Sequence, residues 1–318
     1  MRRAPINRRF VLITTLIAAA AAALVGFVPT VVVGESLPGT PPTPAVPGTQ
    51  TARFADGTIR YQEAGEGAHV VLLLHGFNGH LGQWNGVWRE LEDCGCRRIR
   101  MDLPGFGDSA WDSDAFGVPE QVDRVLALLD RLGVETVTLV GTSMGGSVAA
   151  AIAAEHPDRV QSLVLVAPSG YPGSLVQSGL FGRLARPGFP NRAATVVAKS
   201  PLFGLLYPHS RALQALTVTA TYGRRWSDLL ARIRVPTLII WSRGDATTPY
   251  AYAASVQRAI AGSALISLDP STSHLVPGER PDLVARSIEA MVEGVAPDDV
   301  APSLPDGLLG PGEGAASD

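Results

Sequence analysis

The chain has few charged residues and almost no lysine: 17% of its 318 residues are charged, and Lys199 is the single lysine. The formal net charge is −3, and residues 36–318 carry 22 basic and 28 acidic side chains. An acidic body without a basic stripe argues against a nucleic-acid-binding protein. Apolar residues make up 46% of the chain, which is enough for the core of a large α/β domain.

Cysteine is equally scarce, since Cys94 and Cys96 in a Cys-Gly-Cys stretch are the only two. Two cysteines cannot form a structural zinc site by themselves. A disulfide across one intervening residue departs from ordinary bridge geometry. We therefore expect two free thiols near the start of a strand.

One long hydrophobic run stands out at the amino terminus. Residues 10–33 contain no charge, four arginines precede them, and no further basic residue follows before Arg53. About 20 apolar residues span a bilayer, and arginine accumulates on the cytoplasmic side. We expect residues 1–33 to be a single-pass membrane anchor with the rest of the chain extracytoplasmic. A signal segment that is cleaved, giving a secreted protein, is the alternative.

Composition sets the limits of the folded body. Residues 34–50 hold five prolines and predict an extended linker. Residues 295–318 carry four prolines, four glycines, five acids and no base, and predict a disordered acidic tail. The folded domain is therefore expected over residues 51–294.

Apolar, β-branched runs alternate with helical patterns along this body. Such alternation predicts an α/β fold with a mostly parallel central sheet and helices on both faces. Strands are expected at residues 70–74, 98–102, 136–140, 163–166, 237–241 and 264–268, and helices at residues 118–132, directly after Ser143, and at about 281–292.

Residues 171–225 break this rhythm, with glycines, prolines and short helical pieces but no clear strand. An insertion of this length at the carboxyl edge of a sheet predicts a helical lid. Its apolar side chains either contact a hydrophobic substrate or pack against the body, and the two readings remain open.

Ser143 lies in Gly141-Thr-Ser-Met-Gly145, between a predicted strand and a predicted helix. This G-x-S-x-G arrangement makes a serine a nucleophile, because a sharp strand-to-helix turn lifts its side chain above the sheet. A serine nucleophile needs a base, and the base needs an orienting acid. Asp245 and His274 each follow a later predicted strand, in the chain order this architecture requires.

Two other polar residues have structural interpretations. His75 follows the strand at residues 70–74 and is expected to shape its loop by hydrogen bonding. Asp102 precedes Ser143 and opens Leu-Pro-Gly-Phe-Gly, which is typical of a tight turn, so it is not the expected acid.

Taken together, five segments resemble the α/β-hydrolase superfamily. Together they span nearly all of residues 51–294. The segments are His75-Gly-Phe-Asn78, Asp102-Leu-Pro-Gly-Phe-Gly-Asp-Ser109, Gly141-Thr-Ser-Met-Gly-Gly146, Val235-Pro-Thr-Leu-Ile-Ile-Trp-Ser-Arg-Gly-Asp245 and His274-Leu-Val-Pro-Gly-Glu-Arg-Pro281. One departure is Ser273, where the superfamily often has glycine before the histidine.

The resemblance implies a role for each site residue. Ser143 is the nucleophile, His274 the general base and then acid, and Asp245 the orienting acid. The backbone N–H groups of Phe77 and Met144 are expected to form the oxyanion hole. No metal and no organic cofactor is implied.

The functional hypothesis is therefore a serine hydrolase that acts on a small-molecule carboxylic ester or related acyl substrate, with an apolar acyl group, through an acyl-enzyme. The alternatives within the fold are a carbon–carbon bond hydrolase, a thioesterase or lactonase, and a cofactor-free perhydrolase. A binding module without turnover is the alternative from another functional class.

Overall fold

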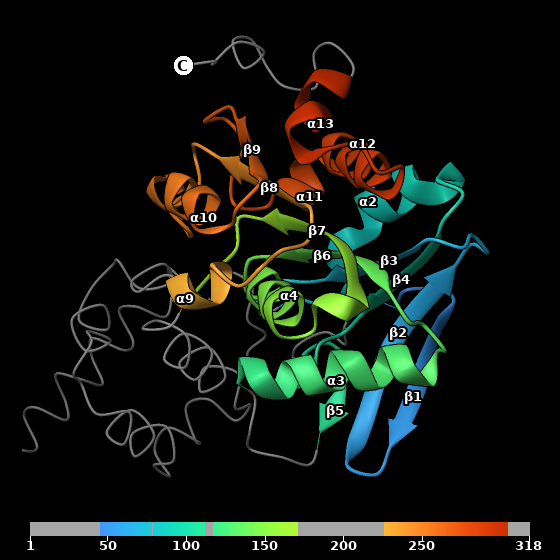
Figure 1. The fold of residues 1–318 in the computed structure, drawn as a ribbon. Coiled ribbons are helices and arrows are strands. Elements are labelled where there is room, and N and C mark those ends of the chain that lie inside the picture. Colours follow the sequence, from blue (N-terminus) through green and yellow to red (C-terminus); the bar gives the residue numbers. More distant parts are fainter. Residues whose placement is uncertain (1–44, 78, 112–116, 171–225, 305–318) are drawn as a thin grey trace, which may run out of the picture.

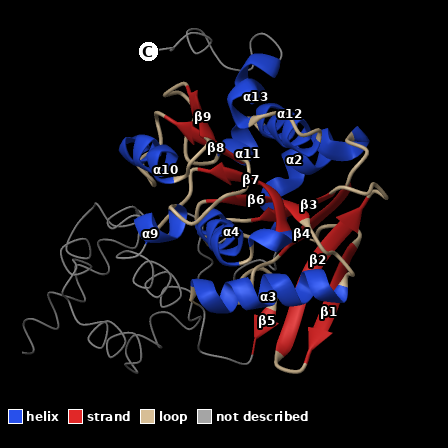
Figure 2. Ribbon diagram, viewed as in Figure 1, coloured by secondary structure: helices blue, strands red, loops and turns tan. Residues whose placement is uncertain are grey.

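The computed structural model describes residues 45–77, 79–111, 117–170 and 226–304. In these ranges the chain forms one sheet of nine strands with helices on both faces (Figures 1 and 2). The strand order is β1-β2-β4-β3-β6-β7-β8-β9, and β5 pairs with β2. Strands β4, β3, β6, β7, β8 and β9 run parallel, whereas β1, β2 and β5 pair antiparallel. The predicted α/β class with a mostly parallel sheet is confirmed.

The strands and helices alternate along most of the described chain. The strands are β1 (Thr49–Phe54), β2 (Gly57–Ala64), β3 (Val70–Leu74), β4 (Arg97–Met101), β5 (Ala110–Trp111), β6 (Val137–Thr142), β7 (Val160–Val166), β8 (Thr237–Ser242) and β9 (Ser263–Leu268). The α-helices are α2 (Asn85–Glu90), α3 (Val118–Arg131), α4 (Met144–Glu155), α9 (Trp226–Leu230), α10 (Ala253–Ala259), α11 (Val276–Glu279), α12 (Pro281–Val292) and α13 (Pro297–Ser303). Short 3₁₀ helices are η1 (Leu81–Trp84), η2 (Leu91–Asp93), η3 (Pro157–Arg159) and η4 (Tyr250–Tyr252).

The sheet is covered on both faces, and β3 shows why its sequence is apolar throughout. Leu72 and Leu74 pack into the cluster that contains α3, α4, α9 and α10. Val71 and Leu73 pack into the opposite cluster with α2, α12 and α13. Because successive side chains of a strand point to opposite faces, only an unbroken apolar run satisfies both layers.

The strand order reverses direction at β3, which has β4 on one side and β6 on the other. The helices that follow these two neighbouring strands, α2 and α4, cover opposite faces of the sheet, whereas the loops before them start side by side at its carboxyl edge. The loop after β3 and the turn after β6 therefore lie beside each other. These are the two segments that hold Phe77 and Ser143.

The predicted elements match the structure best where hydrophobic patterns are strong. Strand β3 and helix α12 have the predicted bounds, and β4, β6, β7, β8 and β9 differ from prediction by one to three residues at an end. The sequence did not predict β1, β2 or β5, which lie towards one end of the sheet. Strand β1 has a single buried residue, and β2 has three consecutive buried residues, one of which is Arg60. Strand β1 also begins inside the predicted linker, residues 34–50.

Strand β4 is unusual because it buries two arginines. The guanidinium groups of Arg98 and Arg100 lie 5.0 and 4.5 Å from the ring centre of Trp88 on α2. Arg100 also donates to the side chains of Gln62 and Asn85. Burial lowers the pKa of Arg100 to about 10, which leaves it charged at neutral pH. Stacking on an aromatic face allows these cations in an otherwise apolar layer.

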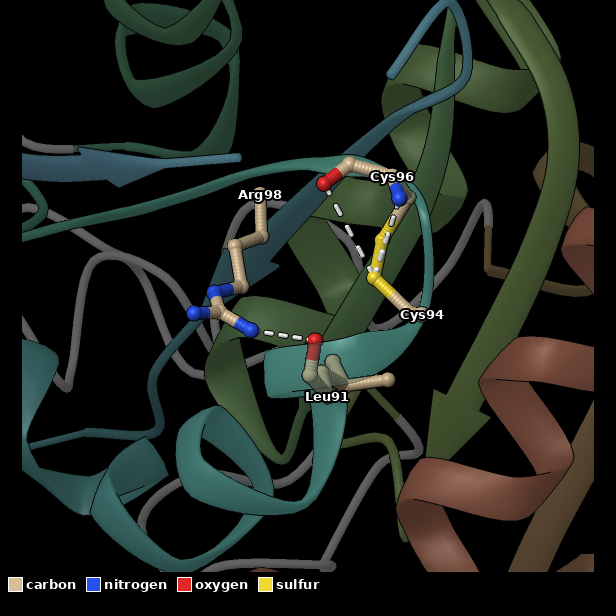
Figure 3. Close-up of a disulfide and its surroundings, with 4 residues drawn as sticks. All are labelled: Leu91, Cys94, Cys96 and Arg98. Atoms are coloured by element: carbon tan, nitrogen blue, oxygen red, sulfur yellow. Dashed lines mark hydrogen bonds between the residues drawn. A yellow bond between two sulfur atoms is a disulfide. The ribbon is translucent and has the colours of Figure 1, made fainter. Parts of the chain in front are cut away.

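The expectation of two free thiols is wrong, because Cys94 and Cys96 form a disulfide with their Cα atoms 5.2 Å apart (Figure 3). Gly95 between them has φ +63°, a left-handed backbone that glycine adopts without strain. That turn brings the Cβ atoms of Cys94 and Cys96 to the same side of the backbone, where their sulfur atoms bond. A Cβ added to Gly67 would lie 1.9 Å from the carbonyl oxygen of Gly95, so the turn before β3 packs directly against the disulfide loop.

The predicted disordered tail also needs correction, because its first part forms helix α13. Val300 is fully buried and Leu304 is 9% exposed, and both belong to the cluster with α12 and β9. The remainder, residues 305–318, lies outside the described residues. An amphipathic pattern of one buried valine in seven residues is too short to predict a helix from sequence.

Two further predictions fall on residues that the structure does not describe: the anchor or signal segment (residues 1–33) and the lid (residues 171–225). Among the described residues, no helix is long and apolar enough to span a membrane. The residues that flank the insertion, Gly170 and Trp226, are described and lie close together. A Cβ on Gly170 would lie 2.7 Å from the indole of Trp226, so the chain leaves and returns at one place.

The packing of α13 gives a stability prediction. Val300→Ala removes two buried methyl groups and is expected to lower the free energy of unfolding by roughly 2 kcal/mol. Asp299→Ala on the exposed side of the same helix is the control and is expected to stay within about 0.5 kcal/mol of wild type. Urea denaturation of the two variants measures the difference, and equal values would show that α13 does not pack on the body.

Candidate active site

Ser143 occupies the turn between β6 and α4 in a backbone conformation that is rare for a side-chain-bearing residue, with φ 51° and ψ −117°. Its N–H donates to the carbonyl of Val166 at 3.0 Å. Its carbonyl accepts from the N–H groups of Ser147 and Ser169, at 3.2 and 2.9 Å. Strained residues persist only where surrounding bonds determine them, and here three bonds do so. The strand–turn–helix context predicted for Ser143 is confirmed.

The glycines of the motif are required by close backbone contacts. A Cβ on Gly141 would lie 2.3 Å from the carbonyl oxygen of Gly145. A Cβ on Gly145 would lie 2.3 Å from the carbonyl oxygen of Leu74 at the end of β3. Both distances are far shorter than any contact a real carbon makes. The start of α4 therefore packs directly on the ends of β6 and β3, and this packing places the turn.

The loop after β3 passes beside Ser143, since a Cβ on Gly76 would lie 3.2 Å from the Cβ of Ser143. The next residue in that loop is Phe77. In the described part of the chain, neither the N–H of Phe77 nor that of Met144 has a hydrogen-bond acceptor. Two unpaired donors on either side of a serine are what an oxyanion hole requires.

His75 holds the loop after β3 in place by hydrogen bonds to Gly76 and Leu103. Its Nε2 accepts from the N–H of Leu103 at 2.9 Å, so its Nδ1 carries the proton and donates to the carbonyl of Gly76 at 2.7 Å. Gln83 accepts from the N–H of Gly76 at 2.9 Å. The predicted role of His75 in shaping the loop is confirmed. Further along, burial lowers the pKa of His80, whose neutral Nδ1 accepts from the N–H of Gly82.

Asp245 and His274 lie on the loops after β8 and β9 and contact each other, with Nδ1 of His274 2.7 Å from Oδ2 of Asp245. The Asp245 side chain is fully buried, and that of His274 is 16% exposed. Oδ1 of Asp245 accepts from the N–H groups of Thr247 and Thr248, both at 2.8 Å. These bonds orient the carboxylate so that His274 donates through Nδ1, and no described residue hydrogen-bonds its Nε2.

Ser273, the departure from the superfamily pattern, is part of a small clamp. Its N–H donates to Glu279 at 2.7 Å, its hydroxyl donates to the other carboxylate oxygen, and it accepts from the N–H of Leu275 at 3.1 Å. Glycine in this place could make only the first bond. The serine therefore adds contacts that hold the His274 loop to α11.

Asp245 and His274 are in direct contact, whereas Ser143 and His274 are not hydrogen-bonded to each other among the described residues. Such serine–histidine bonds are often long until a substrate is bound. The two halves of the site meet through Thr248, whose hydroxyl lies 2.8 Å from Asp245 and 3.3 Å from the carbonyl of Ala167, next to the Val166 carbonyl that binds Ser143. Thr248 is a residue of the site that no sequence pattern predicted.

Asp102 has the structural role that its position predicts. It is fully buried, accepts from the N–H groups of Leu81 and Asp108 at 2.6 and 2.9 Å, and lies 3.5 Å from Arg60. A Cβ on Gly107 would lie 2.2 Å from its carboxylate, so the turn wraps tightly around it. Asp102 therefore holds the loop after β4 in place and joins it to Leu81 at the end of the loop that follows His75.

The described residues contain no group of three or more His, Cys, Asp or Glu side chains that could hold a metal ion. The polar groups that the described loops carry at this edge of the sheet are a serine in a strained turn, two N–H groups without an acceptor among the described residues, and an Asp–His pair. This set suits nucleophilic attack on a carbonyl carbon and stabilisation of the resulting oxyanion.

Comparison with known proteins gives the same grouping. A family model described as the alpha/beta hydrolase fold matches residues 69–210. A 2-hydroxy-6-oxo-6-phenylhexa-2,4-dienoate hydrolase of Comamonas testosteroni is 31% identical over 227 residues, which are 62% of this chain and 78% of that protein. The chain belongs to the α/β-hydrolase superfamily.

Two further proteins that are similar to this α/β-hydrolase have names that describe different activities. A dihydrolipoyllysine-residue acetyltransferase component of an acetoin cleaving system, from Cupriavidus necator, is 39% identical over 121 residues. The chain spans about a third (32%) of that protein's length. A solved structure of a membrane phospholipase A, described as a bacterial virulence factor, is 25% identical with a TM-score of 0.59 and covers 91% of this chain and 99% of its own.

Replacing Asp102 in this α/β-hydrolase is expected to lower stability while leaving catalysis in the folded protein largely intact. Asp102→Asn replaces one of the two carboxylate oxygens that accept from backbone N–H groups by an NH2 donor, and it removes the negative charge that faces Arg60. We therefore expect the free energy of unfolding to fall by about 3 kcal/mol. The kcat of the folded fraction should stay within a few-fold of wild type. Chemical denaturation together with kinetics on a chromogenic ester measures both quantities.

The matched control is Asp108→Asn, because Asp108 also pairs with Arg60 but its side chain is 53% exposed. Exposed ion pairs contribute about 0–1 kcal/mol, so this variant should be nearly as stable as wild type. A stable Asp102→Asn protein that has lost activity would instead place Asp102 in the chemistry.

Proposed function

We propose that this α/β-hydrolase is a serine hydrolase that cleaves carboxylic esters through an acyl-enzyme. Ser143 is the nucleophile, His274 the general base and Asp245 the orienting acid. The observation that carries the proposal is the 2.7 Å contact between His274 Nδ1 and a fully buried Asp245, on the same sheet edge as Ser143. A binding module would not need an ordered Asp–His pair there.

The reaction then follows from the geometry. Nε2 of His274 takes the hydroxyl proton of Ser143 as its oxygen attacks the ester carbonyl carbon. The N–H groups of Phe77 and Met144 bind the oxyanion, where losing one donor costs roughly 2.7–4 kcal/mol of transition-state stabilisation. His274 gives its proton to the leaving alcohol, and water deacylates Ser143 by the same steps in reverse.

An apolar acyl group is the substrate class that we favour. Leu275, next to His274, is 55% exposed and the one large hydrophobic side chain that is exposed among the described residues. The similarity to a membrane phospholipase A supports a lipid-like ester. The lid predicted at residues 171–225 would complete the acyl site.

A carbon–carbon bond hydrolase is the second candidate, favoured by the 31% identity to the dienoate hydrolase of Comamonas testosteroni. Both reactions use the same nucleophile and the same oxyanion hole, and they differ in the leaving group. In the second case the leaving group is a carbanion rather than an alkoxide.

The nucleophile assignment predicts that Ser143→Ala lowers kcat by about 10⁴-fold or more, because the residues of a triad act as a unit. The wild-type protein should form a covalent adduct with a fluorophosphonate probe, and peptide mass spectrometry should place it on Ser143. Chromogenic esters of varied acyl length, with a dienoate of the carbon–carbon hydrolases beside them, measure the substrate class. An unlabelled wild type, or an active Ser143→Ala protein, would overturn the proposal.

For location, we propose a single-pass membrane protein whose catalytic domain is extracytoplasmic. Two features support it: the uncharged run at residues 10–33 after four arginines, and the Cys94–Cys96 disulfide, because disulfides persist in oxidising compartments. Secretion after cleavage of the signal segment is the alternative.

Membrane fractionation of cells that express the full chain tests this location. Full-length protein should remain in the membrane pellet after a high-salt wash and be released by detergent, since an apolar span is held by lipid and not by charge. Protease added to cells whose cell envelope has been permeabilised outside the cytoplasmic membrane should degrade the catalytic domain. A soluble form beginning near residue 34 would instead show cleavage.

A further inference from the structure

The hydroxyl of Thr248 lies between the two members of the Asp–His pair. Thr248 is fully buried, with Oγ1 2.8 Å from Oδ2 of Asp245 and 3.2 Å from Nδ1 of His274. Oδ2 and Nδ1 are themselves 2.7 Å apart, so the three polar atoms form a closed triangle. The carbonyl of Ala167 is the third neighbour, at 3.3 Å.

The hydrogen atoms in this triangle can be counted. An ionised carboxylate has none, and Nδ1 of His274 has one, which it donates to Oδ2. The Thr248 hydroxyl has one hydrogen and two lone pairs. Its hydrogen goes to Oδ2 at 2.8 Å, the closer and more negative of its two acceptors, and a lone pair then faces the Nδ1–H.

The backbone around Thr248 fixes this arrangement. Its N–H donates to Oδ1 of Asp245 at 2.8 Å, and its carbonyl accepts from the indole of Trp241 at 2.8 Å. Trp241 is fully buried at the end of β8. A β-branched side chain on a fixed backbone has few rotamers, so the hydroxyl has little freedom to turn away.

We propose that Thr248 is a positioning residue of the active site: its hydroxyl holds the Asp245 carboxylate and the His274 ring in one relative orientation. The proposal rests on the roles of Ser143, Asp245 and His274 given under the proposed function. Thr248 touches no reacting atom. It acts by restricting the rotation of the carboxylate. Without the Thr248 hydroxyl, Oδ2 would accept from His274 alone.

The test is Thr248→Val, which keeps the shape and removes the hydroxyl. Hydrogen bonds to charged groups contribute about 1.5–3 kcal/mol, so we expect kcat to fall about tenfold or more. KM for a chromogenic ester should stay within about twofold, because ground-state binding does not use the triangle. Thr248→Ser keeps the hydroxyl and should restore most of the lost kcat.

The control is Thr138→Val, since Thr138 is also fully buried and its hydroxyl bonds Ser162 at 3.0 Å, but at the amino-terminal end of β6. It should lose stability without losing kcat. If Thr248→Val does not fold, the pair Thr248→Ser and Thr248→Ala gives the same comparison, with serine active and alanine impaired.

The outcomes separate this proposal from the one on which it rests. A wild-type kcat in Thr248→Val, a loss in KM alone, or a Thr248→Ser protein as impaired as the valine variant would overturn the positioning role. In each case Ser143 labelling of the wild type would still hold. A wild type without turnover or label would overturn the proposed function itself.

Discussion

The active site depends on one packing constraint: the first turn of α4 contacts the ends of β3 and β6 with no side chain between them. A Cβ on Gly145 would overlap the carbonyl of Leu74, and a Cβ on Gly141 would overlap the carbonyl of Gly145. Because these backbones touch, the chain must turn sharply at Ser143, which takes a positive φ of 51°. The same contact keeps the loop that carries Phe77 beside the serine.

The sheet supplies the rest of the geometry. Strands β6, β7, β8 and β9 are parallel neighbours, so their carboxyl ends deliver Ser143, Ala167, Asp245 and His274 to one edge in order. Hydrogen bonds then join each loop to the next. Ser143 binds Val166, Thr248 lies within 3.3 Å of Ala167, and Asp245 binds His274. The site is therefore a row of adjacent loops, each held by its neighbour.

The sequence predicted the parts of the fold whose cause is local or strongly repeated. The run at β3 and the amphipathic α12 have the predicted bounds, and the G-x-S-x-G turn lies where a strand meets a helix. The antiparallel strands β1 and β2 were missed because most of their residues are polar or glycine, which leaves no apolar pattern to read. The disulfide was not predicted because it depends on the positive φ of Gly95, which a count of residues between the two cysteines does not reveal.

The candidate site shows the same division. Asp245 and His274 could be proposed from chain order and from the strands before them, since both depend on sequence and topology. Thr248 could not, because one threonine before a proline has no pattern of its own. Its importance comes from where β8 and its loop place it relative to Ala167 on another strand. Contacts across strands of this kind are visible only in three dimensions.

The residues of the proposed triad lie outside the long insertion between β7 and α9. Ser169 donates to the carbonyl of Ser143, and its neighbour Gly170 packs on Trp226, where the chain re-enters the sheet layer. The 55 residues between these two points thus begin and end at one position. Their length and composition can change without moving β7 relative to β8, because the strands are paired directly. The insertion can therefore vary while the packing at Gly145 and the bonds of Asp245 stay as they are.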